Sequence, residues 1–263
     1  MAAATGTLGR RGPAVARVVA PVVVGLAVLA VWQFLVSVVG VSDYLLPSPA
    51  AIADQLVAFA PSMVSGSLVT ARNALVGLVV GTVLAVLLAA LAAASRRIDA
   101  MTAPVIAALA VIPIVATAPV LNTMFGADTQ FSRQVIAGLA SFVPVFINTL
   151  RGLRQTLPVH RDLMRVYAAT PAQVLRTVTL PTALPYTFTG VRIASSLAVI
   201  SALVAEYFGG PRGGLGSLIS TSAASSAYPR AWAYVVASIV VGLAFFLVAL
   251  ALEQAAGRRA GGG

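Results

Sequence analysis

The sequence contains no cysteine and no lysine, and it has a single histidine, His160. Without cysteine the chain forms neither a disulfide nor a thiolate metal site, and one histidine is too few for the usual metal cluster. Charged residues are also scarce, at 9% of 263 residues, and the seven acidic residues are scattered. No nucleophile–base pair or metal site emerges, so we expect neither an enzyme nor a cofactor bound by this chain.

Hydrophobic residues, in contrast, make up 59% of the chain, more than a soluble fold needs. A membrane-spanning helix requires about 20 apolar residues. Segments of suitable length and polarity occupy residues 18–40, 67–95, 103–124, 133–150, 184–206 and 229–252. The sequence therefore predicts an all-α membrane protein with six transmembrane helices. They form one domain over residues 18–252, between an N-terminal tail, 1–17, and a C-terminal tail, 253–263.

Arginine alone supplies the positive residues, and the net charge is +10. If the six segments cross the membrane in alternating directions, loops 41–66, 125–132 and 207–228 lie on the same side. The first two contain no arginine, and the third contains only Arg212. The opposite side carries Arg10, Arg11, Arg17, Arg96, Arg97, Arg151, Arg154, Arg161, Arg165, Arg176, Arg258 and Arg259. Arginine favours the cytoplasmic side, so both termini are expected in the cytoplasm, with the chain multi-pass in the plasma membrane. The bilayer explains the basic charge without a nucleic-acid partner.

Three prolines, Pro104, Pro113 and Pro119, interrupt the third segment. They could kink a spanning helix or break it into a re-entrant loop. An odd number of spans would destroy the arginine asymmetry. We therefore expect a kinked span inside a bundle of six.

The longest cytoplasmic loop covers residues 151–183, and its apolar residues recur at helical spacing between charged ones. Within it, Thr170, Pro171 and Gln173 are typical of a capping box that starts a helix. The pattern predicts two short amphipathic helices between residues 159 and 180, joined at 168–170. Such helices lie on a lipid surface or dock into a partner, and the residues alone favour neither.

The spacing in this loop resembles the cytoplasmic motif of binding-protein-dependent ABC permeases: E-A-A, three residues, G, nine residues, I, one residue, L-P. Its positions are taken by Asp162, Leu163, Met164, Ala168, Val178, Leu180 and Pro181. The flanking sequences LLPSPAAI, TALPYTFTGVRIASSLAVISALVAEYFGG and GGLGSLI are similar to those of the nitrate, sulfonate and taurine group.

The resemblance implies a type I importer fold in which this loop inserts into a separate ATPase. The implied partners are two ABC ATPase subunits that bind ATP and Mg, a second permease, identical or homologous, and an extracytoplasmic substrate-binding protein. The chain has no G-x-x-x-x-G-K-[ST] sequence, so hydrolysis occurs elsewhere. A secondary carrier or channel is the alternative function, and it would need no coupling motif.

Ala168 departs from the motif, because the family has glycine there. The position suits a left-handed residue that ends the first coupling helix. Alanine in that conformation costs about 1 kcal/mol or more. We hypothesise that the capping box at Thr170 compensates by fixing the start of the second helix.

Residues of the translocation path are harder to predict, since the sequence does not show which side chains face the interior. The polar candidates within the apolar segments are Thr117, Asn122, Ser141, Asn148, Ser195, Ser196 and Ser201. Serine and threonine in such segments more often pack helices together. Arg192 and Glu206 lie near the ends of the fifth segment, where charges commonly snorkel to the interface. Glu206 could also pair with Arg212 and form an outer gate.

The segment IPIVATAPVLNTMFG resembles permeases for nitrate, sulfonates, and pyrimidine thiamine precursors or riboflavin. The resemblance thus implies a small organic or oxyanion nutrient.

Overall fold

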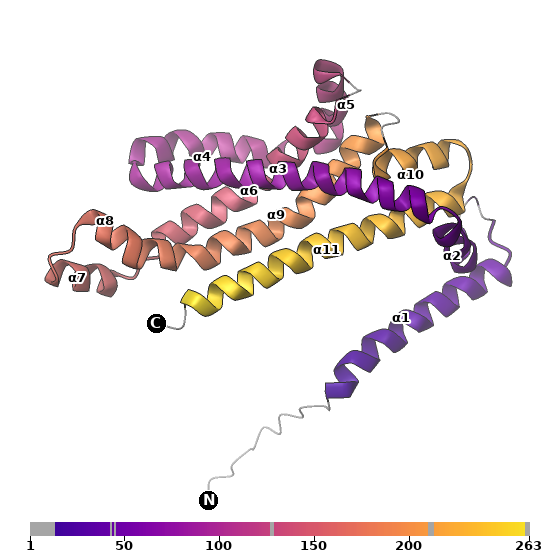
Figure 1. Ribbon diagram of the computed structural model, residues 1–263, viewed down its shortest axis with the longest axis horizontal. Helices are drawn as coiled ribbons and strands as arrows, with labels where there is room; N and C mark the ends of the chain where they lie inside the picture. The colour runs from indigo at the N-terminus through magenta and orange to yellow at the C-terminus, as the bar shows by residue number, and fades with distance from the viewer. Residues whose placement is uncertain (1–13, 43, 45, 127–128, 210–212, 261–263) are drawn as a thin grey trace, which may run out of the picture.

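The computed structural model describes residues 14–42, 44, 46–126, 129–209 and 213–260. Every regular element in these ranges is helical (Figure 1). The elements are α1 (Ala14–Ser37), α2 (Pro49–Ala58), α3 (Ala60–Ala94), α4 (Arg96–Val111), α5 (Ile114–Phe125), α6 (Phe131–Arg154), α7 (Pro158–Val166), α8 (Pro171–Val174), the π-helical segment η1 (Leu175–Thr179), α9 (Leu180–Phe208), α10 (Leu215–Ala224) and α11 (Tyr228–Ala260).

Five helical stretches are long and apolar enough to cross a bilayer: Val19–Ser37, Ala60–Ala94, Phe131–Arg154, Pro171–Phe208 and Tyr228–Arg258. Helices α4 and α5 pass the same test together, although their axes differ by 102°. The described ranges therefore contain five candidate spans, or six if the bent pair is one span. This agrees with the all-α prediction of six.

The third predicted span is broken more sharply than the kink that we expected. Pro104 and Pro119 lie inside α4 and α5, whereas Pro113 separates the two helices. Proline has no N–H to donate to the carbonyl four residues earlier, that of Leu109. The N–H of Ile112 bonds to that carbonyl instead, at 3.4 Å, and α4 ends there.

Small residues form the buried faces of the central helices α3, α6 and α9, which run side by side (Figure 1). On α3 the buried positions include Gly66, Thr70, Gly77, Gly81, Ala85, Ala89 and Ala92, and on α9 they include Gly190, Ala194, Ala198, Ala202 and Ala205. Membrane helices gain little from hydrophobic burial against one another, so close van der Waals packing of small residues holds them together.

The backbones of α3 and α6 approach each other closely at Gly77 and Gly81. A Cβ atom on Gly77 would lie 2.5 Å from the Cβ of Ala137 and 2.7 Å from the backbone nitrogen of Gly138. One turn further along α3, a Cβ on Gly81 would meet the carbonyl oxygen of Gly138 at 2.5 Å. Glycine is therefore required here by space.

Several helices differ in length from the predicted segments. α3 begins at Ala60 rather than residue 67, and α11 continues as helix to Ala260, into the predicted tail. The second short helix of the loop is not separate, because α8, η1 and α9 are continuous. Pro181 cannot donate within the helix, and the i→i+5 bond from the N–H of Leu180 to the carbonyl of Leu175 carries the chain past it.

The first helix, α1, extends away from the rest of the molecule (Figure 1). None of its candidate span is buried. Its C-terminal half meets the bundle through the edge contact of Trp32 with Trp232 and through a hydrogen bond from the backbone N–H of Ala50 to Gln33, at 3.2 Å.

We expect Gly77→Val to destabilise the bundle, because its side chain would overlap α6; overpacking of this kind costs about 1–3 kcal/mol. Thermal unfolding of the purified chain in detergent, followed by loss of the monodisperse chromatographic peak, measures the effect. Gly25→Val is the matched control, since Gly25 in α1 has nothing within 4 Å of its would-be Cβ. Equal melting temperatures for the two variants would contradict the packing described.

Candidate functional site

Helices α7 and α8 project at one end of the bundle, the end opposite α2 and α10 (Figure 1). None of their residues is buried. The exposed apolar side chains of α7 and its cap are Val159, Leu163, Val166 and Tyr167, spaced so that they share one helix face. An apolar face of this kind, on which none of the described residues packs, is suited to a partner.

The turn after α7 has left-handed backbone at Ala168, with φ of 49°. The N–H of Ala168 bonds to the carbonyl of Arg165 at 2.9 Å, and that of Ala169 bonds to the carbonyl of Met164 at 3.0 Å. These two bonds define a Schellman motif, whose left-handed residue is usually glycine. The backbone expected of the motif's glycine is thus present with alanine in its place.

The capping box predicted at the start of the second helix is confirmed. The side chain of Gln173 accepts from the N–H of Thr170 at 2.7 Å, and the hydroxyl of Thr170 accepts from the N–H of Gln173 at 3.4 Å. Asp162 forms an ion pair with Arg165 at 3.0 Å, with both side chains mostly exposed. The remaining motif residues, Val178, Leu180 and Pro181, lie where η1 passes into α9.

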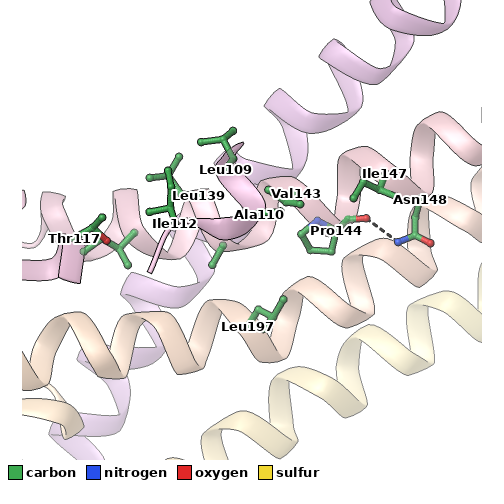
Figure 2. A pocket seen from close by; sticks show the side chains of 12 residues that line it. Leu109, Ala110, Ile112, Thr117, Leu139, Val143, Pro144, Ile147, Asn148 and Leu197 are labelled. Carbon is green, nitrogen blue, oxygen red and sulfur yellow. Dashed lines mark hydrogen bonds between the residues drawn. The ribbon is translucent and has the colours of Figure 1, made fainter. Parts of the chain in front are cut away.

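A cavity of about 460 Å³ lies between α4, α5, α6 and α9. Figure 2 shows Thr117 and Asn148 at opposite ends of it, with Leu139 and Val143 between them. The other lining residues are Leu109, Ala110, Ile112, Ile136, Ala140, Pro144, Ile147 and Leu197. The structure therefore brings two of the seven predicted polar candidates together.

The other five candidates lie away from this cavity. Ser141, Ser195 and Ser201 are buried within the bundle, and Ser196 borders a separate groove between α9, α10 and α11. The hydroxyls of Ser141 and Ser195 bond to carbonyls of their own helices. Asn122 is buried and joins α5 to α6 and α9 through Ser132 and the carbonyl of Ala205.

A second polar site, the Glu206 cluster, consists of Glu206, Thr70, Asn73, Gln130 and Arg133. Glu206 is 1% exposed, so it does not snorkel to the interface as we expected. Its carboxylate accepts from Thr70 at 2.7 Å, from Asn73 at 3.0 Å and from the N–H of Gly216 at 3.2 Å. These hydrogen bonds offset part of the cost of burying the carboxylate.

The Glu206 cluster ties the start of α10 to three spanning helices. The hydroxyl of Thr70 also accepts from the N–H of Leu215 at 2.9 Å, and Arg133 donates to the carbonyl of Gly209 at 3.2 Å. At Gly214 a Cβ would lie 2.3 Å from the carboxyl carbon of Glu206. The loop can approach the carboxylate only because it carries glycine.

Sequence reasoning missed Thr70, Asn73 and Arg133. Thr70 and Asn73 are three residues apart and so share a face of α3, and Arg133 opens the fourth predicted segment. Polar residues in apolar segments were the available signal. Arg212, predicted to pair with Glu206, lies outside the described residues. Arg192 forms an ion pair with Glu253 at 2.5 Å, which joins α9 to α11.

Comparison with known proteins shows the family to which the chain belongs. The sequence model of the family described as "Binding-protein-dependent transport system inner membrane component" matches residues 77–259. A riboflavin transport system permease protein from Chloroflexus aurantiacus is 33% identical over 87% of this chain and 85% of its own length. A probable ABC transporter permease protein from Haemophilus influenzae is 32% identical over 75% of this chain and 80% of its own length.

The chain belongs to this family of binding-protein-dependent ABC transporter permeases, which are non-catalytic, multi-pass subunits of the inner membrane. The crystal structure of an amino acid ABC transporter with histidines shares its fold, with a TM-score of 0.58 at 16% identity over 77% of this chain and 94% of that one. The fold is that of a type I ABC importer permease, as the sequence predicted.

Ala168→Gly should stabilise the turn between α7 and α8 by about 1 kcal/mol, because it removes the left-handed strain on alanine. Slower hydrogen exchange of the backbone amides across 158–174 would show the effect. Ala172→Gly is the control: Ala172 is helical, so glycine there should speed exchange. Faster exchange in both variants would contradict the strain at Ala168.

Glu206→Ala should destabilise the permease strongly, because it leaves three buried donors without their acceptor, each costing about 1–3 kcal/mol. Glu206→Gln keeps the shape and one acceptor oxygen, so its loss should be smaller. Thermal unfolding in detergent ranks the variants. Wild-type melting of Glu206→Ala would show that the cluster contributes no stability.

Proposed function

We propose that this chain forms the translocation path of an ATP-driven importer and couples it to a separate ATPase through α7 and α8. The support is the Schellman turn at Ala168, followed directly by the Thr170 capping box, in the loop whose spacing matches the family motif. A binding-protein-dependent ABC system implies an ATPase and a binding protein as partners. We assign to it two ATPase subunits and a second permease, identical or homologous.

Coupling begins at the exposed apolar face of α7, which would enter a cleft on the ATPase. Leu163 of the motif lies on this face, and Asp162 and Met164 are its neighbours in the sequence. Ala168 with Thr170 fixes the angle between α7 and α8. Val178, Leu180 and Pro181 join α8 to α9 without a break. Movement of the ATPase would therefore reach the fifth span directly.

At the other end of the bundle, we assign the Glu206 cluster the role of an outer gate. Glu206 and Thr70 hold the N–H groups of Gly216 and Leu215 at the start of α10, so release of both bonds would loosen α10 from α3 and α9. Thr117 and Asn148 line the cavity through which substrate would pass, between these two ends of the bundle.

Substrate identity rests on the relatives. They include the riboflavin permease, a formylaminopyrimidine transport permease protein from Halalkalibacterium halodurans, 30% identical over 73% of this chain, and a putative aliphatic sulfonates transport permease protein from Bacillus subtilis, 29% identical over 82%. A bicarbonate transport system permease protein from Synechococcus elongatus matches 49%. We propose a small nutrient from these chemical classes.

Thr170→Ala should weaken coupling, because loss of the capping hydroxyl costs the start of α8 about 1 kcal/mol. ATPase activity of the reconstituted complex should then respond less to the loaded binding protein. Thr129→Ala is the control, since the exposed Thr129 hydroxyl bonds to the carbonyls of Phe125 and Gly126, at the end opposite α7. An unchanged response in Thr170→Ala would contradict the coupling role.

The importer itself is tested by purification and uptake. The tagged chain should retain a P-loop ATPase, and proteoliposomes of the complex should accumulate one of riboflavin, an aminopyrimidine, methanesulfonate or bicarbonate only with ATP. Uptake by the chain alone, driven by an ion gradient and independent of ATP, would indicate a secondary carrier instead.

A further inference from the structure

We propose that the cavity between α4, α5, α6 and α9 admits an uncharged organic substrate and rejects anions. This inference rests on the proposed importer function and narrows its substrate class. The polar residues that line the cavity are Thr117 and Asn148, and both are neutral. No charged side chain lines it among the described residues, so an anion at this depth would lose its hydration without gaining a counter-charge.

Both polar side chains at the cavity donate to a backbone carbonyl four residues earlier in the chain. The amide nitrogen of Asn148 donates to the carbonyl of Pro144 at 2.8 Å, as Figure 2 shows, and the hydroxyl of Thr117 lies 3.5 Å from the carbonyl of Pro113. The amide oxygen of Asn148 is an acceptor. A sulfonate group has no hydrogen to donate to it, whereas an N–H or O–H group of a neutral heterocycle does.

The size and shape of the cavity also favour an uncharged organic substrate. The volume of about 460 Å³ lies in the range of about 300–1,000 Å³ typical of sites for organic ligands, and a four-atom oxyanion would fill little of it. Thr117 and Asn148 stand at opposite ends of an apolar wall (Figure 2). A ring system with polar groups at its edges matches this arrangement.

Positive charge lies beyond the cavity. Arg151 and Arg154 border a separate groove near the C-terminal end of α6. Arg154 is paired with Asp99 at 2.7 Å, and Arg151 is exposed. Their charges are solvated or paired, and neither side chain lines the cavity.

The absence of cysteine makes a direct test available. In proteoliposomes of the complete complex, Thr117→Cys introduces the one thiol of this chain, and mass spectrometry of the permease measures its reaction with iodoacetamide and with iodoacetate. The two reagents are nearly the same size. The ratio of their reaction rates at one cysteine does not depend on the fraction of that cysteine present as thiolate, so ratios at different positions can be compared. Ser225→Cys, in the exposed turn after α10, gives the ratio in open water, and Ser196→Cys gives the rate in the other groove.

At Thr117→Cys, preference for iodoacetamide over iodoacetate should exceed that at Ser225→Cys by about tenfold or more, because the anion must be desolvated. Iodoacetamide should also react faster at Thr117→Cys than at Ser196→Cys, since a translocation cavity admits water. Equal ratios at positions 117 and 225, or no faster reaction at 117 than at 196, would overturn the inference.

Uptake gives a second readout. Transport restricted to methanesulfonate or bicarbonate would overturn the inference while the importer function stands. Failure to retain an ATPase would instead contradict the proposed function, and the labelling ratio would still report whether the cavity rejects anions.

Discussion

Close approach of α3, α6 and α9 is the constraint on which the rest of the structure depends. A bilayer provides little hydrophobic force between helices, so these three are held by backbone contact at small residues such as Gly77, Gly81 and Gly190. That contact brings Thr70 and Asn73 of α3 within hydrogen-bonding distance of Glu206 on α9. With larger side chains at the crossings, the carboxylate would be buried without partners, a state that costs far more than the packing itself.

Much of the fold could be predicted because hydropathy is a local property. Five of the six predicted segments correspond to long apolar helices, and the remaining one, 103–124, corresponds to the α4–α5 pair. The bend at Pro113 could not be predicted in size, because all three prolines remove a donor and only the surroundings decide which one ends a helix. The continuity of α8 with α9 was also missed, since the i→i+5 bond past Pro181 leaves no signal in residue type.

Some parts of the site could likewise be predicted from the sequence, and others could not. The turn at Ala168 and the capping box at Thr170 were predictable, because a Schellman turn and a helix start are fixed by residues close in sequence. The cavity and the Glu206 cluster depend on which residues of distant helices face one another. Thr117 and Ser196 look alike in the sequence, yet one lines the cavity and the other a groove on a different side of α9. Which side chains face one another is decided only when the helices assemble into the bundle.

The unbroken helix from Pro171 to Phe208 contains 38 residues. At about 1.5 Å per residue it is a rod of about 57 Å, which starts at the Thr170 cap and carries Glu206 near its far end. A rigid tilt of about 5° at one end of such a rod displaces the other by about 5 Å, more than the length of a hydrogen bond. This one helix thus spans the bilayer, and its two ends cannot move independently unless the π-helical segment at Leu175–Thr179 bends.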